Sequence, residues 1–236
     1  MERLLSELTE RLRKTYGERL VSVLLYGSAA VGDHHAAFSD LNILCVLSDI
    51  TPRELGESEP IFRWWREHGN PAPLLLSEQE VKTSTDCFAI EFHDITRRHR
   101  VLYGRGVVEG LPLDDRFYRA QLEHELRAKL LRLRQKASGI LSDRALLRKL
   151  LADSLSTFCV LFRHALALHG VEGPMKKREV IAAAREHFGI DPAPFDKLLD
   201  LREGRVKAGE VDPAALFSSY LKQIALVIDA VDRLTK

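Results

Sequence analysis

Apolar and polar residues follow two patterns in the first part of the chain. In the opening segment, leucines recur every three or four positions, which predicts a helix that covers a core with one face. Short apolar runs bounded by turn-forming residues follow, and such runs are typical of buried strands. The pattern predicts strands at Leu20–Tyr26, Leu41–Leu47, Leu74–Leu76 and Phe88–Ile95, with a helix at Arg53–His68 between the second and the third.

The character of the chain changes after Gly110. Strand-like runs stop, and long segments with apolar residues at helical spacing take their place. Glycines and a proline cluster between the two patterns, at Gly104–Pro112, which is typical of a domain boundary. The sequence therefore predicts an α+β protein, with a mixed sheet flanked by helices in residues 1–108 and a helical bundle in residues 109–236. The predicted bundle helices are Asp114–Ser138, Ser142–His169, Lys176–Phe188 and Pro213–Leu234.

Composition indicates the kind of ligand and the cellular compartment to expect. The formal net charge is +1, so no overall field would draw the chain to nucleic acid or a membrane, and we favour a small-molecule ligand. The three cysteines lie far apart without a C-x-x-C pair, which favours reduced core residues over a zinc site. Charged opening residues, and no segment of about 18 uncharged apolar residues, predict a soluble, cytoplasmic protein.

The segment between the first two predicted strands carries the strongest candidate chemistry. The first strand ends in Gly27 and Ser28, and the second begins with Asp40 and Asn42 on either side of a leucine. A glycine after a strand lets the backbone approach a phosphate, and a serine can donate its N–H and hydroxyl to phosphate oxygens. Because alternate residues of a strand share a face, Asp40 and Asn42 should project together, where a carboxylate could hold Mg²⁺.

A third polar group comes from the predicted fourth strand. Apolar residues alternate there, and Glu91 should emerge on the opposite face. Mg²⁺ prefers octahedral oxygen ligands and usually takes one or two of them from protein carboxylates, so Asp40 with Glu91 could serve one ion. A nucleoside triphosphate would supply the remaining ligands. His93 and Asp94 are nearby substitutes for Glu91.

Together, these residues resemble the signature of the DNA polymerase beta superfamily of nucleotidyltransferases. That signature is a hydrophobic strand, Gly-Ser, about a dozen residues, Asp-hydrophobic-Asp/Glu, and a third carboxylate on a later strand. The resemblance covers roughly the first 105 residues, and the helical continuation is similar to that of bacterial aminoglycoside nucleotidyltransferases. It implies ATP or another nucleoside triphosphate as the substrate and a hydroxyl acceptor. It also implies metal ligation by Asp40, Asn42 and Glu91, and catalysis by Asp40 and by Glu91 as general base. Triphosphate contacts would come from Gly27, Ser28 and Lys176, with Lys177 as the alternative to Lys176.

One position departs from the superfamily pattern. Asn42 is a neutral amide where that pattern has an acid. Converging carboxylates offset the repulsion between two metal ions, so the substitution should weaken transfer chemistry more than triphosphate binding. Two alternatives therefore stay open beside an Mg²⁺-dependent nucleotidyltransferase. One is a nucleotide-binding or regulatory protein with a protein partner, and the other is a purely structural protein.

The remaining candidate features have simpler interpretations. The basic run Arg97–Arg100 is typical of a strand edge that is kept soluble, and Trp64 and Trp65 are typical of helix packing. We expect neither a nucleic-acid partner nor a membrane. The apolar stripe of the last predicted helix would suit a core or a homodimer seam. The acceptor cannot be derived from the sequence, because the loops and helices that grip it vary freely on one fold.

Overall fold

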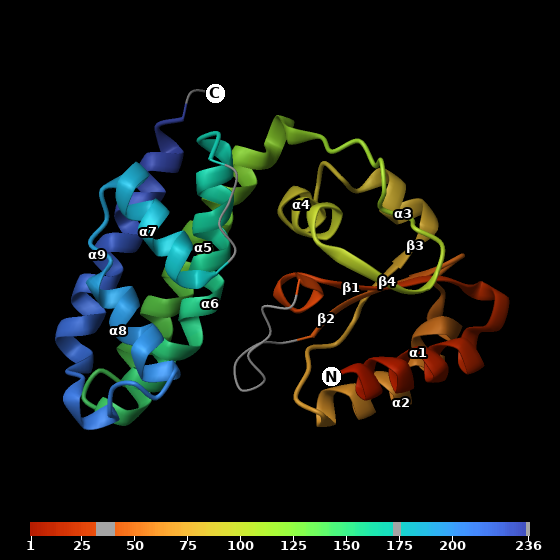
Figure 1. The fold of residues 1–236 in the computed structure, drawn as a ribbon, viewed down its shortest axis with the longest axis horizontal. Coiled ribbons are helices and arrows are strands. Elements are labelled where there is room, and N and C mark those ends of the chain that lie inside the picture. The colour runs from red at the N-terminus through yellow and green to blue at the C-terminus, as the bar shows by residue number, and fades with distance from the viewer. Residues whose placement is uncertain (32–40, 172–175, 235–236) are drawn as a thin grey trace. The chain divides into compact units, whose positions relative to one another are not determined.

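The computed structural model describes residues 1–31, 41–171 and 176–234. The chain forms two compact units, Met1–Phe117 and Tyr118–Lys236. The division lies further along the chain than the boundary expected at residues 108 and 109. The first unit contains a sheet and the second is helical (Figure 1). The protein therefore has the predicted α+β fold, with the sheet in the N-terminal part and the helices of the second unit after it.

The sheet of the first unit has four strands in the order β3-β2-β1-β4. Strand β1 lies in the middle and pairs antiparallel with both β2 and β4, whereas β2 and β3 run parallel. The sheet is therefore mixed, as predicted. The strands are β1 (Leu20–Tyr26), β2 (Asn42–Leu47), β3 (Leu74–Ser77) and β4 (His99–Gly104).

Helices cover both faces of this sheet (Figure 1). Helices α1 (Glu2–Tyr16) and α2 (Pro52–Glu67) pack on one face, where alternate residues of β1 and β2 such as Leu25 and Cys45 are fully buried. Helices α3 (Glu78–Thr83) and α4 (Ala89–Arg97) pack on the opposite face. Strand alternation thus sends every second side chain of β1 and β2 towards α4.

The prediction of a strand at Phe88–Ile95 is wrong. Helix α4 (Ala89–Arg97) occupies this segment, and the fourth strand follows it as β4. The buried residues Ala89, Phe92 and His93 lie three and four positions apart, which is the spacing of one helix face. A short apolar run does not distinguish strand from helix by periodicity alone, and here the helical spacing matches the structure.

The second unit is a bundle of five helices in its described residues. Helix α6 packs against the other four, and its Phe158 and Phe162 join Phe195 of α8 and Tyr220 of α9 in one buried aromatic cluster. Helix α8, which carries prolines at and next to its first turn, had no counterpart in the predicted elements. The five helices are α5 (Tyr118–Ser138), α6 (Arg144–Leu168), α7 (Lys177–Phe188), α8 (Ala193–Arg202) and α9 (Pro213–Asp232).

Helix α9 combines length with an apolar composition. Among the described residues it is the one helix that could cross a membrane by these two criteria, which is weak evidence for a span. Its residues Tyr220, Ile224 and Val227 are fully buried, and the helix packs against α5 and α6. A core helix of a bundle has these same properties, so the packing accounts for the composition.

Candidate functional site

The end of β1 forms the centre of the candidate site. Gly27 follows the strand with φ +78°, a conformation that L side chains rarely adopt, which explains glycine at this position. Its N–H donates to the carbonyl of Arg98 at 3.1 Å, and its own carbonyl accepts from Ala30 at 3.1 Å. The chain then enters a 3₁₀ turn at Ser28–Val31. Gly27 is therefore tied by its backbone to the junction between α4 and β4.

Asn42 lies directly across from the last residue of β1. It pairs with Tyr26 in the antiparallel register, so the two side chains project on the same face of the sheet. The Asn42 Nδ2 atom lies 3.4 Å from the position that a Cβ at Gly27 would take. The half-buried amide of Asn42 therefore borders the glycine turn. Asp40, which should project with it, lies outside the described residues.

Glu91 reaches the same part of the sheet from a helix. It is exposed in the first turn of α4, whose Phe92 and Ile95 form a buried cluster with Leu24, against which Tyr26 packs. The pKa of Tyr26 is raised to about 12, mainly by burial and in addition by the negative charges of Glu91 and Asp94. Both carboxylates therefore raise the pKa of Tyr26, which is the residue that pairs with Asn42.

The two substitutes for Glu91 point to different surroundings. His93 is buried on the core side of α4, and its Nε2 lies 2.5 Å from a carboxylate oxygen of Asp115. Asp94 is half-buried, and its negative charge raises the pKa of Tyr26. Of these two residues, Asp94 is therefore the one that shares surroundings with Glu91.

His99 extends the row of side chains at this end of the sheet. It pairs with Tyr26 from β4, so Asn42, Tyr26 and His99 lie across three neighbouring strands. The His99 Nδ1 lies 2.7 Å from the Ile95 carbonyl and its Nε2 lies 3.1 Å from Glu109. The hydrogen bond with His99 holds the pKa of Glu109 below its usual value. No signal in the sequence had selected this pair.

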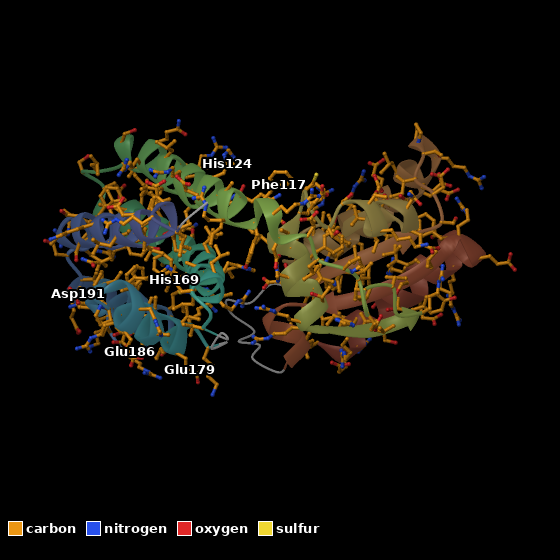
Figure 2. The ribbon with its side chains drawn as sticks, turned by 90° about the horizontal axis from the view of Figure 1, so that it is seen from above. Phe117, His124, His169, Glu179, Glu186 and Asp191 are labelled. Carbon is orange, nitrogen blue, oxygen red and sulfur yellow. The ribbon has the colours of Figure 1, made fainter. Side chains whose placement is uncertain are left out.

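Lys176 belongs to the second unit. It precedes the first residue of α7, is exposed, and its Nζ lies 3.9 Å from Glu179 of the same helix; Figure 2 labels Glu179 and, further along α7, Glu186. Lys177 is less exposed, and it lies close enough to Cys159 of α6 to lower the pKa of that thiol. The pKa of Cys159 is raised to about 12, because burial outweighs the opposing positive charges of Lys177, Arg202 and Arg163, of which Lys177 acts most strongly. These three basic side chains therefore lie around Cys159 of α6.

The described residues 1–31, 41–171 and 176–234 contain no group of three or more histidine, cysteine or acidic side chains that could hold a metal ion. Asp40 is not among these residues, and amide ligands such as that of Asn42 are not in this class. The polar groups that the structure places around Tyr26 include the amide of Asn42 and the carboxylates of Glu91 and Asp94. The amide and the two carboxylates offer oxygen ligands, which Mg²⁺ prefers.

The comparisons with known proteins identify the fold. No protein-family model matches the chain, and no curated protein matches it in sequence. Among solved structures, it is similar to spectinomycin adenyltransferase AAD(9) from Enterococcus faecialis, whose crystal structure contains ATP and spectinomycin. The TM-score is 0.61 at 14% sequence identity, and the match covers 99% of this chain and 100% of that one. The chain thus has a nucleotidyltransferase-type fold over its full length.

Proposed function

We propose that this protein is a nucleotidyltransferase, which transfers a nucleoside monophosphate from a nucleoside triphosphate, first of all ATP, to an acceptor hydroxyl. The observation that carries the proposal is the meeting of Gly27, Asn42 and the carboxylates of α4 around Tyr26, at one end of the sheet in this fold. A solved protein of similar fold was crystallised with ATP, which supports the choice of the nucleotide.

Each residue has a role that follows from its position. Gly27 and Ser28 would bring backbone N–H groups to the triphosphate at the turn after β1. Asp40, Asn42 and Glu91 would hold Mg²⁺, which when bound neutralises phosphate charge and favours the departure of pyrophosphate. Glu91 would accept the proton of the acceptor hydroxyl. The acceptor oxygen then forms a bond to the α-phosphorus, and the bond from that phosphorus to the pyrophosphate oxygen breaks.

Lys176 would contribute from the second unit. A lysine ammonium placed before the first turn of α7 adds to the partial positive charge of the helix N-terminus, and both favour phosphate. Lys177 is the alternative, because it is the first residue of α7 and is less exposed than Lys176. We propose the cytoplasm as the compartment, since reduced cysteines and a cellular triphosphate substrate suit it.

Asn42 favours a second candidate function. A neutral amide at the metal site supplies one negative charge fewer than a carboxylate would, so a site with this amide could bind a nucleotide without transferring it. In that case the protein would be a nucleotide-binding or regulatory protein with a protein partner. Replacing Asn42 with aspartate separates the two functions, because a binding protein should gain transfer activity from the added charge.

The test is a thermal titration with ATP, GTP, CTP and UTP, each with and without Mg²⁺. A ligand at about 100 times its dissociation constant stabilises the native state by roughly 2.7 kcal/mol, which a melting temperature detects readily. Asp40→Ala should abolish the Mg²⁺-dependent rise. Asp49→Ala is the matched control, because Asp49 is an exposed acid at the opposite end of β2.

The outcomes separate the candidate functions. A Mg²⁺-dependent rise with pyrophosphate release on addition of hydroxyl acceptors supports transfer. A rise without release from any acceptor supports the regulatory protein. If no nucleotide raises the melting temperature of the wild-type protein, both functions are wrong and the chain uses this fold for a structural role.

A further inference from the structure

Charge is divided unevenly between the two units. Residues 1–117 contain 14 lysines and arginines and 19 aspartates and glutamates, whereas residues 118–236 contain 21 and 15. The formal net charges are therefore −5 and +6, although that of the whole chain is +1. The positive excess of the second unit arises in residues 127–149, which hold eight basic residues and one acid. This segment, the second half of α5, the turn and the start of α6, is called the basic hairpin below.

The fold places the two arms of the basic hairpin side by side. Helices α5 and α6 pack against each other, and the Ile140 N–H donates to the Ala137 carbonyl at 2.9 Å where α5 ends. Leu130 and Leu133 of α5 are buried, whereas seven of the eight basic residues are exposed and Arg148 is half-buried. Figure 1 shows the turn at one end of the bundle. The fold therefore presents these charges to solvent together.

Acids of the protein neutralise part of this charge. Three of the basic side chains form ion pairs: Arg127, Lys129 and Arg144. The other five form none with residues 1–31, 41–171 or 176–234: Arg132, Arg134, Lys136, Arg148 and Lys149. The acid of the hairpin, Asp143, caps α6 by accepting from two backbone N–H groups, each at 2.9 Å. Most of the positive charge is thus left for a partner.

Helix stability does not explain this accumulation. The C-terminus of α5 favours basic side chains, but the N-terminus of a helix carries partial positive charge and disfavours them. Arg144, Arg148 and Lys149 nevertheless lie in the first two turns of α6, next to the basic end of α5. Like charges on neighbouring helices also repel one another. A bound polyanion would offset both effects.

The side chains of the hairpin indicate which polyanion fits. Residues 127–149 include no aromatic residue, so they offer no ring on which the bases of a single strand could stack. The exposed Leu131, Leu141 and Leu146 are single residues among polar ones, and the apolar stripe of α5 is buried, so no apolar face remains for a membrane. Arginines and lysines without aromatic or apolar neighbours are typical of contacts with phosphates of a duplex.

We propose that the basic hairpin binds the phosphate backbone of a nucleic-acid duplex without reading its sequence. The α5 segment from Arg127 to Lys136 spans about 13 Å at 1.5 Å per residue, and a duplex of that length carries about eight phosphate charges. The hairpin has a similar number of positive charges. The small net charge of the whole chain does not oppose such binding, because charges act over only about 10 Å at ordinary salt concentrations. The hairpin contains none of the residues assigned to the nucleotide or the metal, so the inference is independent of the proposed function.

The test is fluorescence anisotropy of labelled DNA and RNA duplexes of about 20 base pairs, titrated with the full-length protein. We expect dissociation constants of about 10⁻⁶ to 10⁻⁴ M near physiological salt, as for other binding without sequence specificity. Affinity should fall steeply between about 50 and 200 mM salt, because each phosphate contact releases counterions. Binding of either duplex supports the inference if it depends on the hairpin.

A triple substitution tests that dependence. Arg132→Gln, Lys136→Gln and Lys149→Gln together remove three exposed charges of the hairpin that have no ion pair to maintain. The triple variant should bind either duplex about tenfold or more weakly, and the slope of log affinity against log salt should fall by about 2 to 3, since each lost contact contributes about 0.9.

The matched control removes the same charge elsewhere in the second unit. Arg185→Gln, Lys197→Gln and Lys222→Gln replace exposed residues of α7, α8 and α9, again one arginine and two lysines. This variant should keep nearly the wild-type affinity and salt slope. Urea midpoints measured by circular dichroism show that both variants are folded.

The other outcomes overturn the inference. They are equal losses of affinity in the two folded triple variants, no binding of either duplex by the wild-type protein at about 50 mM salt, and tighter binding of a single strand than of a duplex. Binding to phosphatidylglycerol vesicles without binding to duplexes would identify a membrane surface instead. Should the hairpin variant not fold, Lys149→Gln is compared with Lys222→Gln: only the former should lower the salt slope, by about 0.9, and equal slopes would contradict the proposal.

Discussion

The two units use their buried residues differently. In the first unit a sheet separates two apolar clusters, and polar side chains gather where β1 ends and β2 begins. In the second unit, the described helices surround α6, and an aromatic cluster occupies the core. In the first unit, strand alternation places Tyr26 and Asn42 on one face, and the packing of α4 on the sheet adds Glu91. The second unit depends on contacts between helices far apart in sequence, so substitutions in its core should lower stability without touching the site.

The largest expected change in stability comes from removing a ring of the aromatic cluster, which tests whether the second unit's core is independent of the candidate site. Phe162 is fully buried, and its ring centroid lies 5.4 Å from that of Phe195. Phe162→Ala should lower the free energy of unfolding by about 3–5 kcal/mol, because it leaves a cavity in a packed core. Urea unfolding followed by circular dichroism would measure the loss. Leu131→Ala, at an exposed position of α5, is the control and should change little.

Tryptophan fluorescence shows whether the loss of stability in Phe162→Ala is confined to the second unit. The two tryptophans of the chain, Trp64 and Trp65, both lie on α2 in the first unit. We expect Phe162→Ala to move the circular dichroism midpoint and to leave the fluorescence midpoint in place. If both midpoints move together, the units unfold as one and the comparison between them loses its basis.

A smaller effect is expected from a buried polar contact of the second unit. The Tyr118 hydroxyl lies 2.6 Å from Nδ1 of His164, and both side chains are buried. Tyr118→Phe keeps the ring and removes the hydroxyl, which should cost about 1–3 kcal/mol of unfolding free energy because a buried hydrogen-bonding atom loses a partner. Tyr103→Phe, at a half-buried residue of β4, is the matched control. Equal stabilities of the two variants would contradict the importance of the contact with His164.

The elements of the first unit that could be predicted are those whose turns are chemically distinct. Strand β1 was predicted at its observed bounds, because a run of apolar residues ends at Gly27. A serine followed three residues later by a glutamate is the local pattern of a capping box, and Ser77 and Glu80 form one: the Ser77 hydroxyl accepts from the Glu80 N–H at 3.2 Å and the Glu80 carboxylate accepts from the Ser77 N–H at 2.7 Å. In both places a few local residues determine the backbone.

The candidate site was predictable only in part, because local sequence determines some of its residues and tertiary packing determines the others. Strand alternation predicts the face that Asn42 shares with Tyr26, because it depends only on neighbouring residues. Glu91 was placed on a strand, whereas it lies on α4, and its approach to Tyr26 depends on how that helix packs on the sheet. Such tertiary packing is not encoded in a local pattern. The metal roles of Asp40, Asn42 and Glu91 stay predictions.

The smallest effect concerns a buried acid of the first unit. Glu54 of α2 accepts a hydrogen bond from the Thr51 hydroxyl and pairs with Arg19. These contacts, the one with Thr51 foremost, lower the pKa of Glu54 from 4.5 to about 2. A carboxyl with a lowered folded-state pKa stabilises the native state above its unfolded pKa, and this stabilisation is lost as the pH falls from about 4.5 towards 2.

Glu54→Gln should therefore lower the stability of the first unit at neutral pH, and its stability should converge with that of the wild-type protein as the pH approaches about 2. The measurement is the urea midpoint from tryptophan fluorescence as a function of pH, since Trp65 lies on the same helix. Glu59→Gln is the control, because Glu59 is exposed and its ion pair is formed along the helix with the exposed Arg63. Parallel pH profiles for Glu54→Gln and the wild-type protein would show that the contacts of Glu54 do not contribute to the stability of the first unit.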